Sequence, residues 1–393
     1  MKKILLCFFL LLRVIGGNAQ PHIYFNFVSH NEETGQWNGS PFYAANRAKL
    51  ILLTNYFQSQ GITWNMQSDW VYLTNVLTKE TPALMALTNN KNILRWMSED
   101  KGVEMDPHAH ESQYIYPDVV KLMDSIGLPE SKIIGGTIYN DSNGVNIWTN
   151  LVNGQNGIMF PSKFWKPDYM MGGGTPNHVA DLKYYGMWNP QSPMAYLTND
   201  TSVHLTHIGV GCSMKIRDTT TVAPFVASLR QYVENIQTGH YPPNGFYMQT
   251  IFFEQADLNT VAFYNKVIEI ADSVNAIMNS TNASWKTFKQ ATTIWETTYG
   301  RQAFQWDCWQ MATAVADVND KTNALTIYPD PASSVITIKN YSKEYPLEII
   351  DMTGKQIMRI SSIPSDSILD VSSLANGIYL LKNGKFFVRF VKE

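Results

Sequence analysis

Two short polar clusters hold the residues of this sequence that are best suited to chemistry. The first is residues 29–33, with the sequence SHNEE, and the second is residues 104–111, with the sequence EMDPHAHE. His108 and His110 are one residue apart, and alternate residues of an extended segment project to the same side. Two imidazoles placed in this way can bind one divalent cation, zinc or a similar ion. A carboxylate such as that of Glu32 would complete a set of two histidines and one acid.

These groups predict hydrolysis in one of two forms. With a cation, Asp106 is a second candidate for the acidic ligand, and Glu33 would accept a proton from an activated water. Without a cation, Glu33 or Asp106 paired with Glu254 would act as the two carboxylates of a glycosidase. Glu254 belongs to this set because it follows an apolar strand and points to the same edge of the sheet. A third interpretation makes the histidines hydrogen-bonded core or loop residues of a protein that binds glycans without catalysis.

Aromatic side chains are abundant, with 20 Tyr and 11 Trp in 393 residues. Flat rings with a polar edge suit a surface that meets carbohydrate, although the same rings also fill protein cores. The region 141–199 has no clear period and is expected to wall the site. We therefore predict that substrate contacts are made by His30, Trp148, Trp165, Trp188 and His207, with core packing as the alternative for at least half of the rings.

The elements that must position these residues alternate along the chain before residue 317. The expected strands are 22–29, 62–65, 102–105, 132–138, 203–210 and 246–253. The expected helices are 42–58, 82–98, 116–126, 222–236 and 260–278. Repeated strand-then-helix order predicts an α/β fold with a parallel sheet, and the length suits a β/α barrel. The carboxyl ends of such strands share one edge, which is where both polar clusters lie.

A second domain of different construction follows a polar segment. After residues 317–324 we find only short alternating strands, expected at 325–328, 335–339, 346–350, 356–360, 378–382 and 385–391. Short strands separated by turn residues predict a small all-β sandwich. The expected organisation is therefore a signal peptide at 1–19, a barrel domain at 20–316, a linker at 317–324 and a terminal domain at 325–393.

The N-terminus predicts export. Lys2 and Lys3 precede an apolar run at 4–12, and small residues before Gln20 offer a cleavage site after Ala19. The apolar run is much shorter than the ~20 residues of a membrane span, and no later stretch approaches that length.

Cysteine content and charge exclude several other classes of protein. The exported chain would keep Cys212 and Cys308, which allow one disulfide but neither a four-cysteine zinc cluster nor a disulfide scaffold. Charged residues are 16% of the chain and the net charge is −3, so there is no basic field to attract nucleic acid.

The terminal domain resembles a known family. Residues 328–338 read YPDPASSVITI, residues 347–355 read LEIIDMTGK, and residues 369–381 read LDVSSLANGIYLL. This pattern is similar to the C-terminal sorting domain of the type IX secretion system, with Asp330 in place of the usual Asn. The resemblance implies that the type IX secretion machinery recognises the tail. It also implies that the protein is secreted or held at the outer cell surface.

The larger domain more faintly resembles the polysaccharide-deacetylase and glycoside-hydrolase β/α-barrel superfamily. The resemblance makes residues 29–33 the first motif and 104–111 the second, and it implies a metal held by an acid of the first motif with His108 and His110. Two features depart from the family, because paired aspartates are replaced in the first motif and the histidines of the second are more closely spaced. The leading hypothesis is a secreted, deacetylase-like hydrolase of a polysaccharide or glycan.

Overall fold

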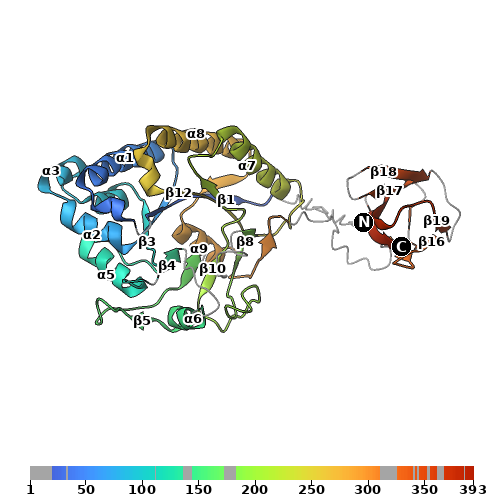
Figure 1. Ribbon diagram of the computed structural model, residues 1–393, viewed down its shortest axis with the longest axis horizontal. Coiled ribbons are helices and arrows are strands. Elements are labelled where there is room, and N and C mark those ends of the chain that lie inside the picture. Colours follow the sequence, from blue (N-terminus) through green and yellow to red (C-terminus); the bar gives the residue numbers. More distant parts are fainter. Residues whose placement is uncertain are drawn as a thin grey trace, which may run out of the picture. The chain divides into compact units, whose positions relative to one another are not determined.

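The computed structural model describes most of the chain, which forms two compact units, residues 1–312 and 313–393 (Figure 1). The described residues are 20–31, 34–110, 112–135, 144–171, 183–309, 325–339, 341–342, 345–351, 355–360, 367–384 and 386–393. The proposed signal peptide and linker lie outside them. Within the described ranges, no helix has the length and apolarity needed to cross a membrane.

Parallel strands form the centre of the first unit. Their order in the main sheet is β11-β12-β1-β2-β3, with β13 paired to the start of β1. The bounds are β1 (Ile23–Asn31), β2 (Trp64–Ser68), β3 (Glu104–Pro107), β11 (Met214–Ile216), β12 (Tyr247–Glu254) and β13 (Ala283–Trp285). In this sheet β1 is paired on both sides, which explains why all nine of its residues are buried.

A second sheet and two links close the strands into a ring. The second sheet has the order β4-β7-β10-β9, made of β4 (Ile133–Gly135), β7 (Tyr169–Met171), β10 (Thr206–Ile208) and β9 (Met187–Trp188). A parallel bridge between His108 and Gly135 joins β3 to β4. Beyond β10, the backbone N–H of Thr250 in β12 donates to Val210 over 3.1 Å. The result is a β/α barrel, and the predicted fold class is confirmed.

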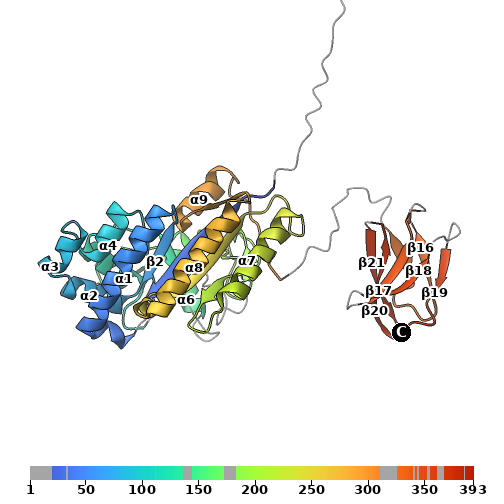
Figure 2. The ribbon, with the colours of Figure 1, turned by 90° about the horizontal axis from the view of Figure 1, so that it is seen from above.

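Most helices surround this ring on the outside, whereas α9 (Phe288–Thr297) packs at its amino end (Figures 1 and 2). The longer ones are α1 (Ser40–Ser59), α2 (Trp70–Lys79), α5 (Tyr116–Ile126), α6 (Gly144–Asn153), α7 (Val222–Gln237), α8 (Val261–Met278) and α9 (Phe288–Thr297). Shorter helical turns are η1 (Gly35–Asn38), α3 (Pro82–Met85), η2 (Ala86–Thr88), α4 (Ile93–Arg95), η3 (Trp96–Asp100) and η6 (Gln255–Asn259).

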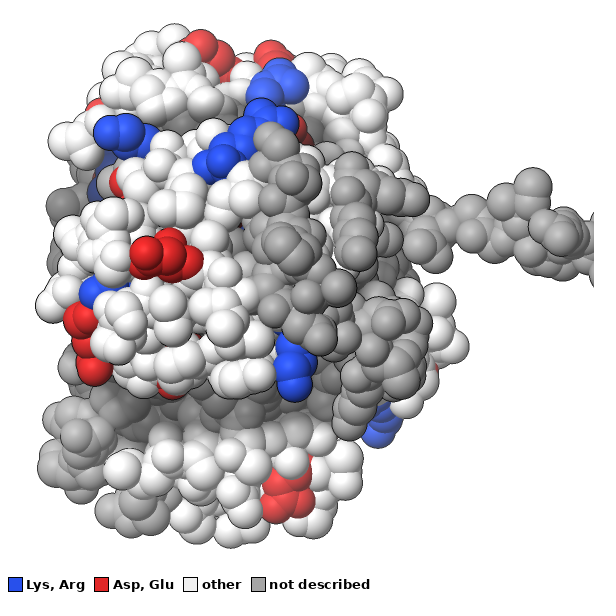
Figure 3. Space-filling model, turned by 90° about the vertical axis from the view of Figure 1, so that its right-hand side faces the viewer, with Lys and Arg blue, Asp and Glu red and all other residues white. Residues whose placement is uncertain are grey.

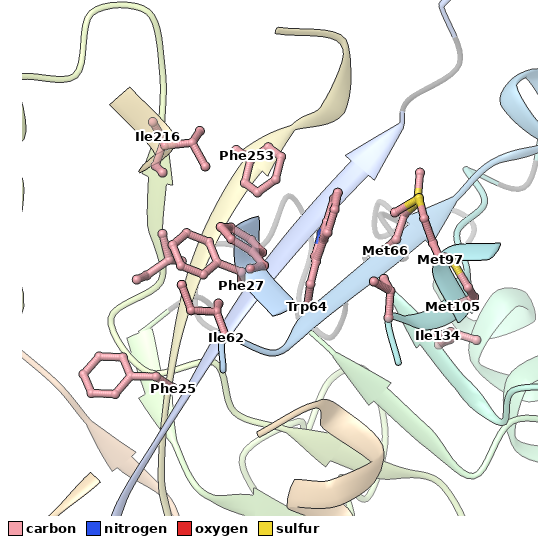
Figure 4. Close-up of a cluster of buried hydrophobic side chains, with 14 of the residues drawn as sticks. Phe25, Phe27, Ile62, Trp64, Met66, Met97, Met105, Ile134, Ile216 and Phe253 are labelled. Carbon is pink, nitrogen blue, oxygen red and sulfur yellow. The ribbon is translucent and has the colours of Figure 1, made fainter. Parts of the chain in front are cut away.

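The outer face of the barrel carries the larger of two cores. Alternate residues of the strands point outward, and Figure 4 shows Phe25, Phe27, Trp64 and Phe253 gathered with methionines of β2 and β3. Each of these four side chains is at most 1% exposed. Burial of one such side chain stabilises the fold by about 1.5–3 kcal/mol, so this layer fixes the helices on the strands.

The inner face has a separate apolar cluster that α9 completes. Tyr24 and Met248 point inward and pack with Phe288 and Trp295 of α9. The carboxylate of Glu104 accepts hydrogen bonds of 3.0 and 3.1 Å from the backbone N–H of Lys289. A carboxylate at a helix N-terminus is favoured by the helix dipole. Helix α9 thus closes the amino end of the barrel, and the opposite end is left for a site.

Two small antiparallel pairs flank the barrel. They are β5 (Gln155–Asn156) with β6 (Phe164–Trp165), and β8 (Tyr184–Tyr185) with β14 (Trp306–Asp307). A disulfide joins Cys212, just before β11, to Cys308, just after β14, with their Cα atoms 5.8 Å apart. The sequence allowed a disulfide between Cys212 and Cys308 without deciding whether it forms, and the structure contains it.

The second unit consists of two antiparallel sheets. Their orders are β15-β16-β19 and β18-β17-β20-β21. The strands are β15 (Thr326–Tyr328), β16 (Val335–Lys339), β17 (Leu347–Asp351), β18 (Gln356–Ile360), β19 (Ser367–Asp370), β20 (Gly377–Asn383) and β21 (Phe386–Lys392). Ile336, Ile349, Leu381 and Phe390 are fully buried between them. This is the small all-β unit that the sequence predicts.

Candidate functional site

The carboxyl ends of four neighbouring strands bring polar side chains together. His30 near the end of β1 stands in register with Gln67 of β2 on one side and with Glu254 of β12 on the other. His108 directly follows β3, and its backbone N–H donates to Ser68 at the end of β2 over 2.9 Å. We call this end of the barrel the mouth.

His108 and His110 form the closest pair of candidate ligands, which we call the imidazole pair. Their Nε2 atoms are 3.0 Å apart. Two zinc-bound nitrogens at ordinary bond lengths and a tetrahedral angle are about 3.4 Å apart, so the pair needs only a small adjustment to share one ion. The predicted convergence of alternate side chains therefore agrees with the geometry, and two nitrogen ligands fit the ion.

The acidic ligand predicted for this ion lies outside the described residues. Glu32 and Glu33 follow β1 directly, and Glu111 follows His110, but none of the three is described. Within the described part of the chain there is no group of three or more His, Cys, Asp or Glu side chains that could hold a metal ion. The described residues therefore include two of the three predicted ligands, His108 and His110.

His30 is held between its neighbours rather than projecting into solvent. Its Nε2 donates to Oε1 of Gln67 over 2.5 Å, and its ring lies 4.4 Å from the ring of His108. Phe252 meets the same imidazole edge-on with ring centres 4.4 Å apart. These contacts fix the orientation of His30 beside the imidazole pair.

Gly135 makes room for the Gln67 amide at the end of β4. A Cβ atom on Gly135 would lie 1.9 Å from Oε1 of Gln67, closer than any packed contact. The carbonyl of Gly135 accepts from the Tyr116 hydroxyl over 2.7 Å, which fixes the strand end from outside. The absence of a side chain here is therefore a packing requirement of the mouth.

Glu254 lies at the mouth, but it is paired with a cation. Lys215 of β11 donates to its Oε1 over 2.6 Å and also lies 4.7 Å from the centre of the Phe252 ring. The pair is partly exposed, at 31% for Lys215 and 21% for Glu254. The Glu254 carboxylate is therefore engaged in an ion pair at the mouth.

Asp106 is placed inside the barrel. It is fully buried and accepts hydrogen bonds from Asn65 over 2.9 Å and from Ser131 over 2.6 Å. Burial raises its pKa well above the usual range, and the nearby carboxyl of Glu104 raises it further. The structure therefore brings Asp106 together with Glu104, Asn65 and Ser131 and gives it no exposed surface.

The three tryptophans predicted to stack on sugars are buried, with 7% of Trp148, 2% of Trp165 and none of Trp188 exposed. The indole N–H of Trp165 donates to the Ser131 carbonyl, and that of Trp188 donates to the Tyr196 carbonyl. His207 is equally buried, and its Nδ1 lies 2.5 Å from the Tyr196 hydroxyl. In this structure these side chains pack in the interior and offer no ring face to a ligand.

Three residues at the mouth were not singled out by the sequence. Gln67 lies in a short strand of mixed polarity, which the sequence analysis did not connect with the site. Strict alternation along that strand would have predicted that Gln67 faces inward, on the same side as Asn65. Trp70 begins α2 directly after β2, and Tyr114 lies four residues after His110. Their rings stack with centres 4.7 Å apart and planes at 14°.

A cavity of about 760 Å³ lies at the amino end of the strands, away from the mouth. Its lining includes Glu104, Ser131, Tyr169, Lys289 and Glu296. Most of its charged groups already have partners, since Glu104 accepts from the α9 backbone and Arg301 pairs with Glu296. His204 also lines this cavity, whereas His108 and His110 do not.

Charged side chains are sparse on the surface. On the face shown in Figure 3, Lys, Arg, Asp and Glu occur singly or in small groups on a largely neutral surface. This agrees with a composition of 16% charged residues. A surface of this kind favours neutral ligands over polyanions.

Comparison with solved structures finds several similar chains. A 4-alpha-glucanotransferase from Thermococcus litoralis is 12% identical with a TM-score of 0.43, over 69% of this chain and 40% of that one. A protein described as a polysaccharide deacetylase from Mycobacterium smegmatis is 8% identical with a TM-score of 0.38, over 72% and 92%. A protein described as a glycoside hydrolase/deacetylase from Parabacteroides distasonis is 8% identical with a TM-score of 0.41, over 95% and 84%.

We draw no conclusion about activity from these likenesses, whose TM-scores all lie below 0.5. The chain spans less than half the length of the glucanotransferase. No curated protein matches the sequence.

The family model for the secretion system C-terminal sorting domain matches residues 326–385, which lie in the second unit. The predicted tail is thus confirmed: this unit is a type IX C-terminal sorting domain, and the protein is secreted or attached to the cell surface.

Proposed function

We propose that the barrel unit is a carbohydrate-active hydrolase of deacetylase type that works outside the cell. The observation that carries the proposal is the 3.0 Å separation of the His108 and His110 Nε2 atoms at the mouth. Export by a sorting domain places this site where extracellular polysaccharides are met. The similarity of the two polar motifs to those of the deacetylase and glycoside-hydrolase superfamily supports the same reaction class.

In this proposal His108, His110 and Glu32 would hold one divalent cation, zinc or a similar ion. Such an ion would polarise the acyl carbonyl and lower the pKa of a water molecule, which supplies a hydroxide nucleophile. The carboxylate of Glu33 accepts the proton of that water. Attack of the water oxygen on the ester or amide carbon would break the bond from that carbon to the sugar oxygen or nitrogen. The proton taken by Glu33 would pass to this leaving atom, which departs as a hydroxyl or amine while acetate is released.

The chain's own residues prepare the site for this step. Ser68 and the bridge to Gly135 hold the backbone of His108 on both sides. Gln67 and Phe252 fix His30 beside the imidazole pair, where it orients the sugar. Lys215 pairs with Glu254 at the rim. Asp106 supports the strand ends from the interior and takes no proton from substrate.

The test combines metal content with acetate release. The full chain is loaded with zinc, dialysed, and assayed on acetylated xylan and on a chitin hexasaccharide. We expect about one zinc per chain, and we expect that alanine at His108 or His110 lowers both zinc content and acetate release at least tenfold. His22→Ala is the matched control, because His22 binds Asn282 and Ser284 at the far end of β1. Wild-type protein that holds no metal, or acetate release that is unchanged in the His108 variant, would overturn the proposal.

A further inference from the structure

Two partly exposed rings, those of Trp70 and Tyr114, follow the strand ends and loop that carry the imidazole pair. Trp70 and Tyr114 are stacked nearly parallel, and Phe160 lies beyond Tyr114 with ring centres 6.4 Å apart. We call Trp70, Tyr114 and Phe160 the aromatic shelf. All three are partly exposed, whereas the tryptophans predicted to bind sugar are buried.

The shelf is attached to the same backbone segments as the histidines. Trp70 follows Ser68 by two residues, and the carbonyl of Ser68 accepts from the His108 N–H. Asp69 between them caps α2, and its backbone N–H donates to the side-chain Oδ1 of Asn31 at the end of β1 over 2.9 Å. Tyr114 is four residues beyond His110. A ligand on the shelf would therefore lie next to any group held at the imidazole pair.

Polar atoms of the shelf lack the partners that they usually have. Buried tryptophans of this barrel donate their indole N–H, as Trp64 does to Ser29 and Trp285 to Asn275, each over 2.8 Å. The indole N–H of Trp70 has no hydrogen-bond partner among the described residues. No described residue bonds to the Tyr114 hydroxyl either. The Trp70 nitrogen itself is buried, so the partly exposed rings and the Tyr114 hydroxyl are the groups that suit the apolar face and the hydroxyl rim of a sugar ring.

Phe160, the third residue of the aromatic shelf, lies in a segment that one buried carboxylate holds in place. Asp118 of α5 accepts from the backbone N–H groups of Ile158, Met159 and Phe160 over 2.8–3.0 Å. Gly157 allows this approach, because a Cβ there would lie 2.2 Å from Oδ1 of Asp118. The charge of Asp118 is thus directed at the backbone. The shelf therefore presents neutral groups, which favours a neutral sugar over an acidic one.

We propose that the aromatic shelf is a glycan-binding subsite that holds a neutral pyranose ring beside the residue being deacylated. The statement that the bound sugar belongs to the substrate rests on the proposed function. The statement that the shelf binds a sugar does not depend on it. Trp148, Trp165 and Trp188 are buried, so this subsite would supply the aromatic contacts by which the hydrolase binds a polymer. It predicts a preference for chains over single sugars.

The experiment measures glycan binding apart from hydrolysis. The full chain and its Trp70→Ala, Trp70→Phe and Tyr114→Ala variants are titrated with chitin hexasaccharide and soluble acetylated xylan, and affinity is followed by calorimetry. We expect the alanine variants to bind about three- to tenfold more weakly, as loss of one aromatic stacking contact predicts. Trp70→Phe, which keeps a ring, should recover much of the affinity. Trp309→Ala removes an exposed indole, 72% exposed, beyond the barrel and serves as the control.

The outcomes separate this inference from the proposed function. If hydrolysis is present, Trp70→Ala should raise KM for the polymer, leave kcat unchanged, and leave activity on an acetylated monosaccharide unchanged. If hydrolysis is absent but glycan binding falls in the shelf variants, the subsite stands and the proposed function fails. Binding by folded Trp70→Ala and Tyr114→Ala proteins that equals wild type, or no binding of either glycan by wild type, would overturn the inference. Thermal melting curves establish that each variant is folded.

Discussion

Glu104 and Asp106 lie two residues apart on the inward face of β3, and the carboxyl groups of both are buried. Burial raises the pKa of each, and the charge of Glu104 raises that of Asp106 further. Two neighbouring buried acids of this kind resist being ionised together. Neither is needed for the proposed chemistry, so their effect is on stability.

The pair predicts that stability falls as pH rises. The folded chain keeps protons that the unfolded chain loses near pH 4, so the stabilising contribution is complete below that pH. It is lost as pH rises through the raised folded pKa. Asp106→Asn should therefore raise the free energy of unfolding at pH 8, and by less at pH 5. Urea melts at the two pH values measure this. Glu269→Gln, on the exposed side of α8, is the control. A destabilised Asp106→Asn protein at pH 8 would contradict the argument.

A second prediction concerns Gly135. Alanine there should push the Gln67 amide away from His30, because the new Cβ would meet Oε1 at 1.9 Å and Cδ at 2.2 Å. Overpacking of this kind costs about 1–3 kcal/mol. Gly35→Ala is the matched control, since nothing lies within 4 Å of a Cβ at Gly35. Chemical denaturation compares the two, and equal stability would show that the mouth tolerates a side chain at this position.

A third prediction concerns the disulfide. Replacing Cys212 and Cys308 with serine should lower the free energy of unfolding by about 2–5 kcal/mol, because the bond closes a long loop of 96 residues. Reduction of the wild-type protein should lower its Tm to that of the double variant. A Tm that does not respond to reductant would mean that the bond contributes nothing in solution.

A fourth prediction concerns Asp118. Asp118→Asn replaces one accepting oxygen with an amide that cannot accept, so at least one of the backbone N–H groups of residues 158–160 loses its partner. An unsatisfied buried donor costs about 1–3 kcal/mol. Hydrogen exchange should show faster exchange in residues 157–160 while β1 stays protected. Asp200→Asn, at an exposed side chain that accepts from Ser202, should leave this loop unchanged.

Much of the fold follows from alternation and periodicity in the sequence. The strand expected at 246–253 is β12 displaced by one residue, the helix expected at 260–278 is α8 almost in full, and the tail strands at 335–339 and 356–360 are β16 and β18. Strand β19 was not predicted, because its apolar residues follow a polar segment with no period. The helix expected at 82–98 breaks into short turns, where Asn89 and Asn90 adopt positive φ.

The candidate site was predicted less completely, and the reason is physical. Local spacing identified His108 and His110, because alternate residues of the short extended segment after β3 are positioned by that segment alone. Gln67, Gly135 and Trp70 belong to the mouth only because three other strands or loops end beside β3, and no local pattern encodes that meeting. Trp165 and Trp188 were wrongly expected at the surface for the same reason. Their indole N–H groups bond to the carbonyls of Ser131 and Tyr196, and these contacts form only when the loops pack together.

The disulfide has a mechanical consequence for a protein exported by its tail. Any pull on the sorting domain is transmitted along the backbone to Cys308, the second-last described residue of the first unit. From there it passes directly through the covalent bond into Cys212 beside the barrel wall. The 95 residues between the two cysteines, which include β12 and Glu254, are bypassed by the load. The barrel can therefore be drawn along by its C-terminus without its strands being unthreaded from that end.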